Sequence, residues 1–279
     1  MLFDGAPRRM SGSVPLSHAP SLVDPGAPVR SVGRGQTGGM DPAPFVAATE
    51  REGLAALQAG RAGLDAPVPT CEGWTVADVL GHLGRVHRSV SEIIERRSLV
   101  IPDVKIPKPP PGDAVLGFFE DGLARVVAAL GSIGPDEPVY SWSGQGNGRF
   151  YHRRMAHELA VHRFDVEAAH GPPAPFDPDM ATDGIDEFYD VLVPFSASRW
   201  DRPLPAGSLH LHRTDGQGEW LVRAVDGTVV TTREHAKGDV AVRGSASDLF
   251  RFVWNRGRSD DLATFGDESV AEEWAALAP

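Results

Sequence analysis

Two side chains in the segment 151–170 have the types and the spacing of metal ligands. Glu158 and His162 lie four residues apart, and in an α-helix this spacing places both on one face, roughly 5 to 6 Å apart at Cβ. Two ligands do not make a metal site, and the best candidate for a third is His82. A carboxylate and two imidazoles with one open position form the ligand set of a catalytic zinc site.

A simpler interpretation of the pair is an exposed carboxylate and a surface histidine. The apolar residues Met155, Leu159 and Val166 argue against it, because they place Glu158 and His162 on or beside the apolar face of the same helix. A carboxylate near a core needs a cation or hydrogen-bond partners, since leaving it unpaired costs several kcal/mol. The sequence therefore favours a metal ligand pair.

His82 lies in a second helical segment, on a face that is otherwise apolar. A ligand pointing into a helical bundle has this pattern. The alternative is a core histidine held by a hydrogen bond.

The other titratable side chains of segment 151–170 are expected to lie away from the metal. His157 is one residue off the face shared by the proposed ligands and is a weaker candidate. We expect the remaining ones to point outward or to be exposed: His152, Arg153, Arg154, Arg163, Glu167 and His170.

Hydrophobic residues at helical spacing predict four helices in the first half of the chain. The first begins after Met40 and has an apolar stripe that includes Leu54, and the second begins at the cap residue Thr75. A proline-rich stretch at 100–112 must be an irregular connection. Four helices with a long middle connection predict a bundle, and the expected helices cover 42–64, 75–97, 113–130 and 151–169.

The pattern changes after residue 178. One more helix, at 180–198, is expected to precede four short antiparallel strands and two helices. The fold class is therefore α+β with two domains, a bundle at 40–173 and a smaller domain at 178–279. The expected strands cover 208–212, 219–224, 229–233 and 239–243, and the expected helices cover 245–254 and 271–277.

Composition limits the function. The chain has 279 residues, a formal net charge of −11 and one cysteine, Cys71. Nucleic acid is not expected as a partner, because its recognition needs clustered Lys and Arg. No apolar run reaches the roughly 18 to 20 residues that span a membrane, and the single cysteine suits a reducing cytoplasm. Residues 1–39, rich in Gly, Pro and Ser, are expected to be disordered, either as a dispensable extension or as a functional tail.

Six strings, spread over both halves of the chain, carry a resemblance to a known protein family. The strings are 71–83 (CEGWTVADVLGHL), 154–158 (RMAHE), 162–165 (HRFD), 242–249 (VRGSASDL), 254–256 (WNR) and 266–267 (GD). They resemble the mycothiol-dependent maleylpyruvate isomerase family, which combines a DinB-like metal-binding four-helix bundle with a C-terminal domain related to sterol carrier proteins. The resemblance extends from about Met40 to the end of the chain.

The resemblance implies a divalent metal, usually Zn²⁺, at the positions of His82, Glu158 and His162. It also implies mycothiol as the thiol cosubstrate and a C-terminal arginine that assists catalysis, which matches either Arg256 or Arg258. Cys71 is interpreted as a packed small residue rather than a nucleophile.

These features predict an enzyme that adds a zinc-activated thiolate to a small electrophile, for cis-trans isomerisation or for thiol S-transfer. One alternative is a small-molecule-binding protein with a carrier-like domain and a non-catalytic metal. Another is an interaction protein without a metal.

Overall fold

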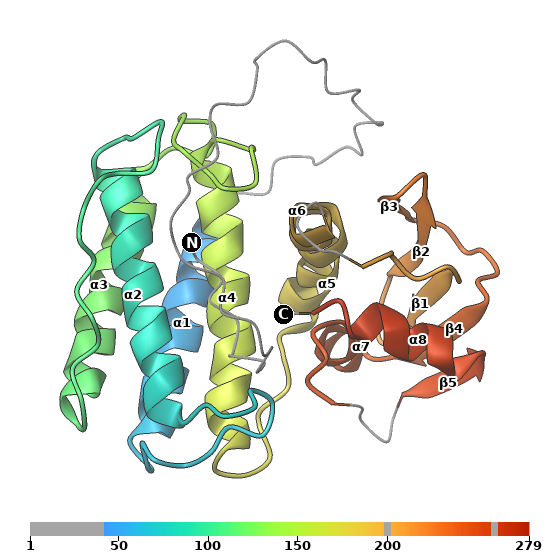
Figure 1. The fold of residues 1–279 in the computed structure, drawn as a ribbon, viewed down its shortest axis with the longest axis horizontal. Coiled ribbons are helices and arrows are strands. Elements are labelled where there is room, and N and C mark those ends of the chain that lie inside the picture. The colour runs from blue at the N-terminus through green and yellow to red at the C-terminus, as the bar shows by residue number, and fades with distance from the viewer. Residues whose placement is uncertain (1–41, 198–201, 258–261, 279) are drawn as a thin grey trace.

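The structure is a computed structural model that describes residues 42–197, 202–257 and 262–278. The expected disordered segment 1–39 and the alternative catalytic residue Arg258 lie outside these ranges. Figure 1 shows a helical bundle on one side, a β-sheet with two helices on the other, and a pair of helices between them. The expected α+β fold with an N-terminal four-helix bundle is confirmed.

The bundle contains four long helices. α1 packs mainly against α4, and α2 packs mainly against α3. A capping box begins α2, because the backbone N–H of Asp78 donates to Thr75 Oγ1 and the backbone N–H of Thr75 donates to Asp78 Oδ2. The connection before α3 is irregular, as its prolines predict. The helices are α1 (Ala43–Gly60), α2 (Val76–Glu95), α3 (Ala114–Ser132) and α4 (Gly148–Ala168).

The expected helix at 180–198 consists of three consecutive helical elements. These are α5 (Pro178–Glu187), the π-helical turn η1 (Phe188–Leu192) and α6 (Val193–Ala197). In Figure 1 they lie between the bundle and the sheet.

The sheet has five strands in the order β3-β2-β1-β4-β5. The expectation of purely antiparallel strands is wrong, because β1 and β4 pair in parallel. A fifth strand, β5, was not expected: it has only four residues and no apolar alternation. The elements are β1 (Leu209–Arg213), β2 (Glu219–Val225), β3 (Thr228–Thr232), β4 (Val240–Gly244), α7 (Ala246–Val253), β5 (Ala263–Gly266) and α8 (Glu268–Ala275).

Helix α4 belongs to two hydrophobic cores. Met155 and Leu159 pack into the core of the bundle, whereas Val161 and Phe164 pack into the core formed with the sheet and α5. A helix that is covered on opposite sides has few exposed positions. Most residues of α4 are therefore buried, including charged ones.

This double packing corrects several expectations about α4. His152, Arg154 and Arg163 were expected to point outward, but each is buried. His152 donates from Nε2 to the carbonyl oxygen of Leu130 at 2.9 Å, and both arginines pair with carboxylates. His170 is exposed, as predicted. In α1, Leu54 belongs to the expected apolar stripe but is 51% exposed.

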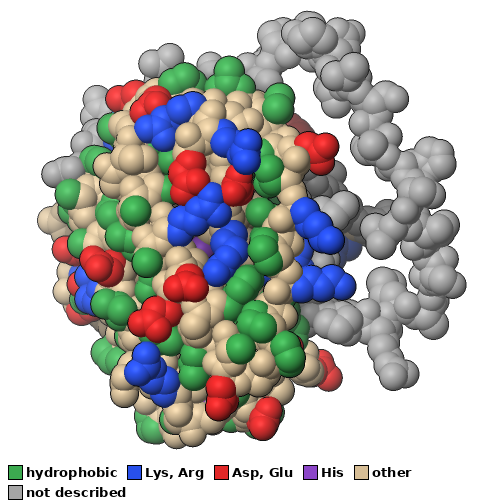
Figure 2. Space-filling model, turned by 90° about the vertical axis from the view of Figure 1, so that its left-hand side faces the viewer, with side chains coloured by type: hydrophobic (Ala, Val, Ile, Leu, Met, Phe, Trp, Pro, Cys, Tyr) green, Lys and Arg blue, Asp and Glu red, His purple; other side chains and the backbone are tan. Residues whose placement is uncertain are grey.

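The molecular surface carries charges of both signs. On the face shown in Figure 2, Lys and Arg side chains are interspersed with Asp and Glu side chains, and apolar side chains are scattered among them. Among the described residues, no helix has the length and apolarity needed to cross a membrane.

Candidate metal centre

The structure brings the three predicted metal ligands together. His82 projects from α2, and Glu158 and His162 project from successive turns of α4. The potential ligand atoms all lie within 4.8 Å of one another. His82 Nε2 is 3.2 Å from Glu158 Oε1, and His162 Nε2 is 3.7 Å from the same oxygen. Residues 76 positions apart in the chain therefore converge because α2 and α4 are neighbours in the bundle.

The geometry of this cluster fits a tetrahedral metal. With Zn–N bonds near 2.0 Å, two imidazoles on one zinc ion have ring centres about 5 Å apart. The ring centres of His82 and His162 are 5.2 Å apart. Two imidazoles and one carboxylate are also a donor set that zinc accepts. Both imidazoles remain partly exposed, which leaves room for an additional ligand.

Glu158 is buried but remains charged. Burial alone would raise its pKa, but the hydrogen bond with His82 and the charge of Arg154 outweigh that cost and hold the pKa well below its usual range. Arg154 Nη2 donates to Glu158 Oε2 at 3.2 Å, and Arg154 Nη1 donates to Glu187 on α5. An anionic carboxylate is therefore available at neutral pH.

His162 is oriented by a buried carboxylate that sequence reasoning did not identify. His162 Nδ1 lies 2.9 Å from Asp165 Oδ2, and Asp165 is completely buried. Such a contact fixes the imidazole tautomer so that Nε2, which faces Glu158, is available to bind a metal. The spacing of three residues on one helix was the available sequence signal.

Arg256 holds that carboxylate in place. Its Nε donates to Asp165 Oδ1 at 2.9 Å and its Nη2 donates to Asp165 Oδ2 at 3.1 Å. Thr70 Oγ1 donates to Oδ1 at 2.6 Å. Burial alone would raise the pKa of Asp165, but the charge of Arg256 and the contact with His162 hold it well below its usual range. The C-terminal domain is thereby connected to the candidate metal centre.

The environment of Cys71 agrees with its interpretation as a non-nucleophilic residue. Its Sγ lies 3.6 Å from Asp165 Oδ2. Burial and the negative charge of Asp165 raise the pKa of the thiol to about 12. Cys71 is therefore a protonated thiol at neutral pH.

Two further histidines lie near the cluster or on the same helix. His87 is completely buried, and burial lowers its pKa to about 3, so its imidazole is neutral. His157 is not part of the cluster: its Nε2 contacts Asp183 of α5 at 2.7 Å. His157 therefore connects two helices.

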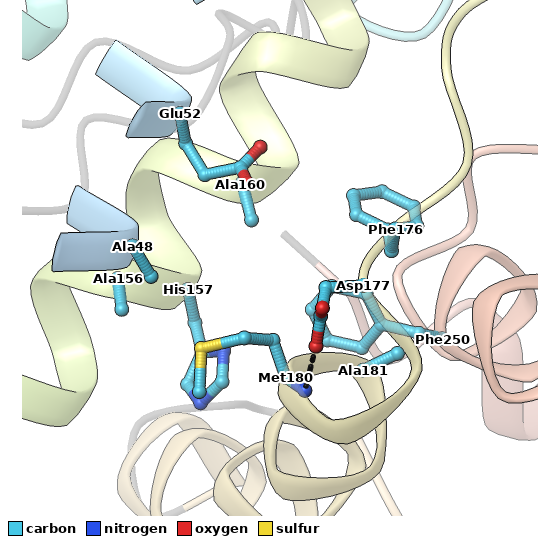
Figure 3. A pocket seen from close by; sticks show the side chains of 10 residues that line it. All are labelled: Ala48, Glu52, Ala156, His157, Ala160, Phe176, Asp177, Met180, Ala181 and Phe250. Carbon is cyan, nitrogen blue, oxygen red and sulfur yellow. Dashed lines mark hydrogen bonds between the residues drawn. The ribbon is translucent and has the colours of Figure 1, made fainter. Parts of the chain in front are cut away.

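Two described pockets lie apart from the three candidate ligands. Figure 3 shows one between α1, α4, α5 with the segment that precedes it, and α7. Its volume is about 10 Å³, space for one water molecule at most. The other, of about 430 Å³, is lined by residues 142–145 and by residues of η1 and α6. Trp142 packs on Phe150, which is roughly 12 Å from Glu158 along α4 at 1.5 Å per residue.

The fold and the site define an α+β protein whose helical bundle presents a candidate two-histidine, one-carboxylate metal centre. Residues 46–167 match the mycothiol maleylpyruvate isomerase N-terminal domain, and residues 179–273 match the C-terminal domain of the same family. The chain belongs to the mycothiol-dependent maleylpyruvate isomerase family.

Solved structures support the fold. The chain is similar to a mycothiol-dependent maleylpyruvate isomerase, with 14% identity, a TM-score of 0.55, and coverage of 81% of this chain and 93% of that one. A mutant of such an isomerase has the same identity and coverage and a TM-score of 0.53. Comparison with curated proteins gave no match.

Proposed function

We propose that this protein is a metal-dependent enzyme that uses mycothiol to modify a small electrophilic substrate. The observation that carries the proposal is the convergence of His82, Glu158 and His162, with ligand atoms within 4.8 Å of one another, in a member of this family. A site with three protein ligands has an open position, whereas a structural zinc is normally closed by four. An open position is where a thiol can bind.

A zinc ion bound by these residues would hold a thiol as its thiolate and so supply a nucleophile at neutral pH. In an isomerisation, the thiol adds to an activated cis double bond, the resulting single bond rotates, and elimination returns the thiol. In an S-transfer, the adduct is released with the thiol sulfur attached. Both outcomes need the same nucleophile.

The protein's own residues prepare this chemistry. Glu158 supplies a negative charge, and Asp165 fixes His162 in the tautomer that directs Nε2 inward. The guanidinium of Arg256 donates to Asp165, to the carbonyl oxygen of Trp254 and to Cys71 Sγ. We therefore propose Arg256 as a positioning residue that acts through Asp165 and His162.

The test is replacement of His82 by Ala in the full chain. We expect loss of the zinc bound at this site and loss of turnover, both for isomerisation of a cis-configured electrophile and for formation of mycothiol adducts. His170→Ala is the matched control, because His170 is exposed and outside the cluster. Unchanged zinc content in the His82→Ala protein would contradict the ligand assignment. Zinc loss without any effect on a measurable activity would favour a non-catalytic metal.

A further inference from the structure

A second group of imidazoles lies on the outer face of the sheet. Alternate residues of a strand point to opposite faces, so Leu209 and Leu211 of β1 enter the core while His210 and His212 face away from it. The register places Glu219 of β2 directly opposite His212. The three polar side chains therefore share one face.

A third imidazole reaches this face from the connection between β3 and β4. His235 Nδ1 lies 3.0 Å and 3.1 Å from the two carboxylate oxygens of Glu219. His210 Nε2 lies 2.5 Å from Oε2 of the same carboxylate, and His212 Nδ1 lies 2.7 Å from Oε1. Three imidazoles from two separate segments thus surround one carboxylate.

The arrangement is close to that of a metal site. The ring centre of His210 is 6.2 Å from that of His212 and 5.5 Å from that of His235. The ring centres of His212 and His235 are 6.1 Å apart. Three imidazoles on one tetrahedral zinc ion have centres about 5 Å apart, so a small inward shift of each ring is sufficient. All four potential ligand atoms already lie within 4.8 Å of one another.

The chemistry of the donors selects the ion. Neutral imidazoles and one carboxylate offer four donors and a net charge of −1, which suits a divalent cation. Imidazole favours Zn²⁺ and related transition metals over Mg²⁺ and Ca²⁺, which prefer oxygen. Four protein ligands close the tetrahedral shell, as in structural zinc sites.

We propose that His210, His212, Glu219 and His235 form a second zinc site, separate from the candidate centre in the bundle. The side chain of His235 is 79% exposed, whereas that of His210 is 7% exposed. Metal binding would therefore attach a surface connection, residues 233–239, to the sheet. This role is structural and does not depend on the function proposed for the bundle.

The test is a zinc count on the full chain after chelator treatment, reloading and removal of unbound ion. We expect two zinc ions per wild-type chain and one in a His210→Ala, His212→Ala double variant. His235→Gln should weaken the binding of one zinc equivalent at least 10-fold. Because His235 is exposed, this substitution should not disturb folding, and weaker binding would be due to the lost ligand. His82→Ala should remove the other equivalent, and the control His170→Ala should retain both.

The outcomes separate the two proposals. A single equivalent in the wild type that His82→Ala removes would overturn the second site and leave the bundle site intact. An unchanged zinc affinity in both the His235→Gln protein and the double variant would also overturn it. Loss of one equivalent in the double variant, with no effect of His82→Ala, would support the second site and contradict the bundle ligands. If the site binds Cu²⁺ but does not bind Zn²⁺ when zinc is supplied alone, the assignment to zinc is wrong.

Discussion

Replacement of Asp165 by Asn tests whether the C-terminal domain supports the candidate metal centre. The change preserves size but removes the negative charge that Arg256 contacts through two nitrogens. Arg256 is 6% exposed, so its guanidinium would lose its carboxylate partner without gaining water. Removing one partner of a buried ion pair costs about 3 to 5 kcal/mol. We therefore expect the free energy of unfolding of the metal-free protein to fall by about 3 to 5 kcal/mol.

The same change should weaken metal binding. Asp165 contacts His162 Nδ1 at 2.9 Å, and loss of a partner that orients a ligand typically lowers metal affinity 10- to 100-fold. Urea denaturation in the presence of a chelator measures the first effect. Competition with a zinc-binding dye measures the second effect. It is carried out in the His210→Ala, His212→Ala background, so that the titration reports the bundle site alone.

Thr70→Val is the matched control for this experiment. It removes one hydrogen bond to Asp165 but leaves the charge pair, so we expect a loss of about 1 kcal/mol and a zinc affinity within about threefold of the parent. If Asp165→Asn binds zinc as tightly as the parent while His162→Ala does not, Asp165 does not orient the ligand. A loss of stability equal to that of Thr70→Val would contradict the expected cost of breaking the ion pair.

Three further predictions concern buried groups around the site. Because the pKa of Cys71 is raised to about 12, iodoacetamide should alkylate the folded protein at pH 8 far more slowly than the unfolded protein, and Cys71→Ser should retain turnover. Burial alone would raise the pKa of Asp183, but its contacts with His157 and Arg153 outweigh burial and lower the pKa to about 2. Its stabilising contribution, about 2 kcal/mol, should therefore be complete above pH 4 and disappear as the pH falls towards 2, and Asp183→Asn should flatten that part of the stability profile. Arg154→Met should lower the free energy of unfolding by about 3 to 5 kcal/mol, because it leaves Glu187 and Glu158 without their cation. Adding Glu187→Gln should recover part of that free energy. If urea denaturation shows that the effects of the two substitutions simply add, Arg154 and Glu187 are not coupled.

Local sequence patterns predicted most of the bundle. Helical spacing of apolar residues located the four helices to within a few positions, and the cap at Thr75 is present. The pair of Glu158 and His162 was visible because helical spacing encodes which side chains share a face. Such signals depend on residues close in the chain.

Local patterns could not predict what covers each face. The sequence of helix α4 is amphipathic, yet the C-terminal domain packs on its other side. Arg154 is buried and pairs with Glu187 of α5. Arg163 is buried where Glu52 of α1 and the carbonyl oxygen of Ala174 accept its hydrogen bonds. The parallel pairing of β1 with β4 was missed because it joins strands separated by two others in the chain.

The sequence alone determined the family, the helices of the bundle and the residue types of the candidate metal centre. Only the tertiary structure decided that Arg256 meets Asp165, 91 positions away, and that His235 joins His210 beside Glu219. The physical reason is that periodicity and capping act over a few residues. The contacts that orient ligands arise when separate elements pack together.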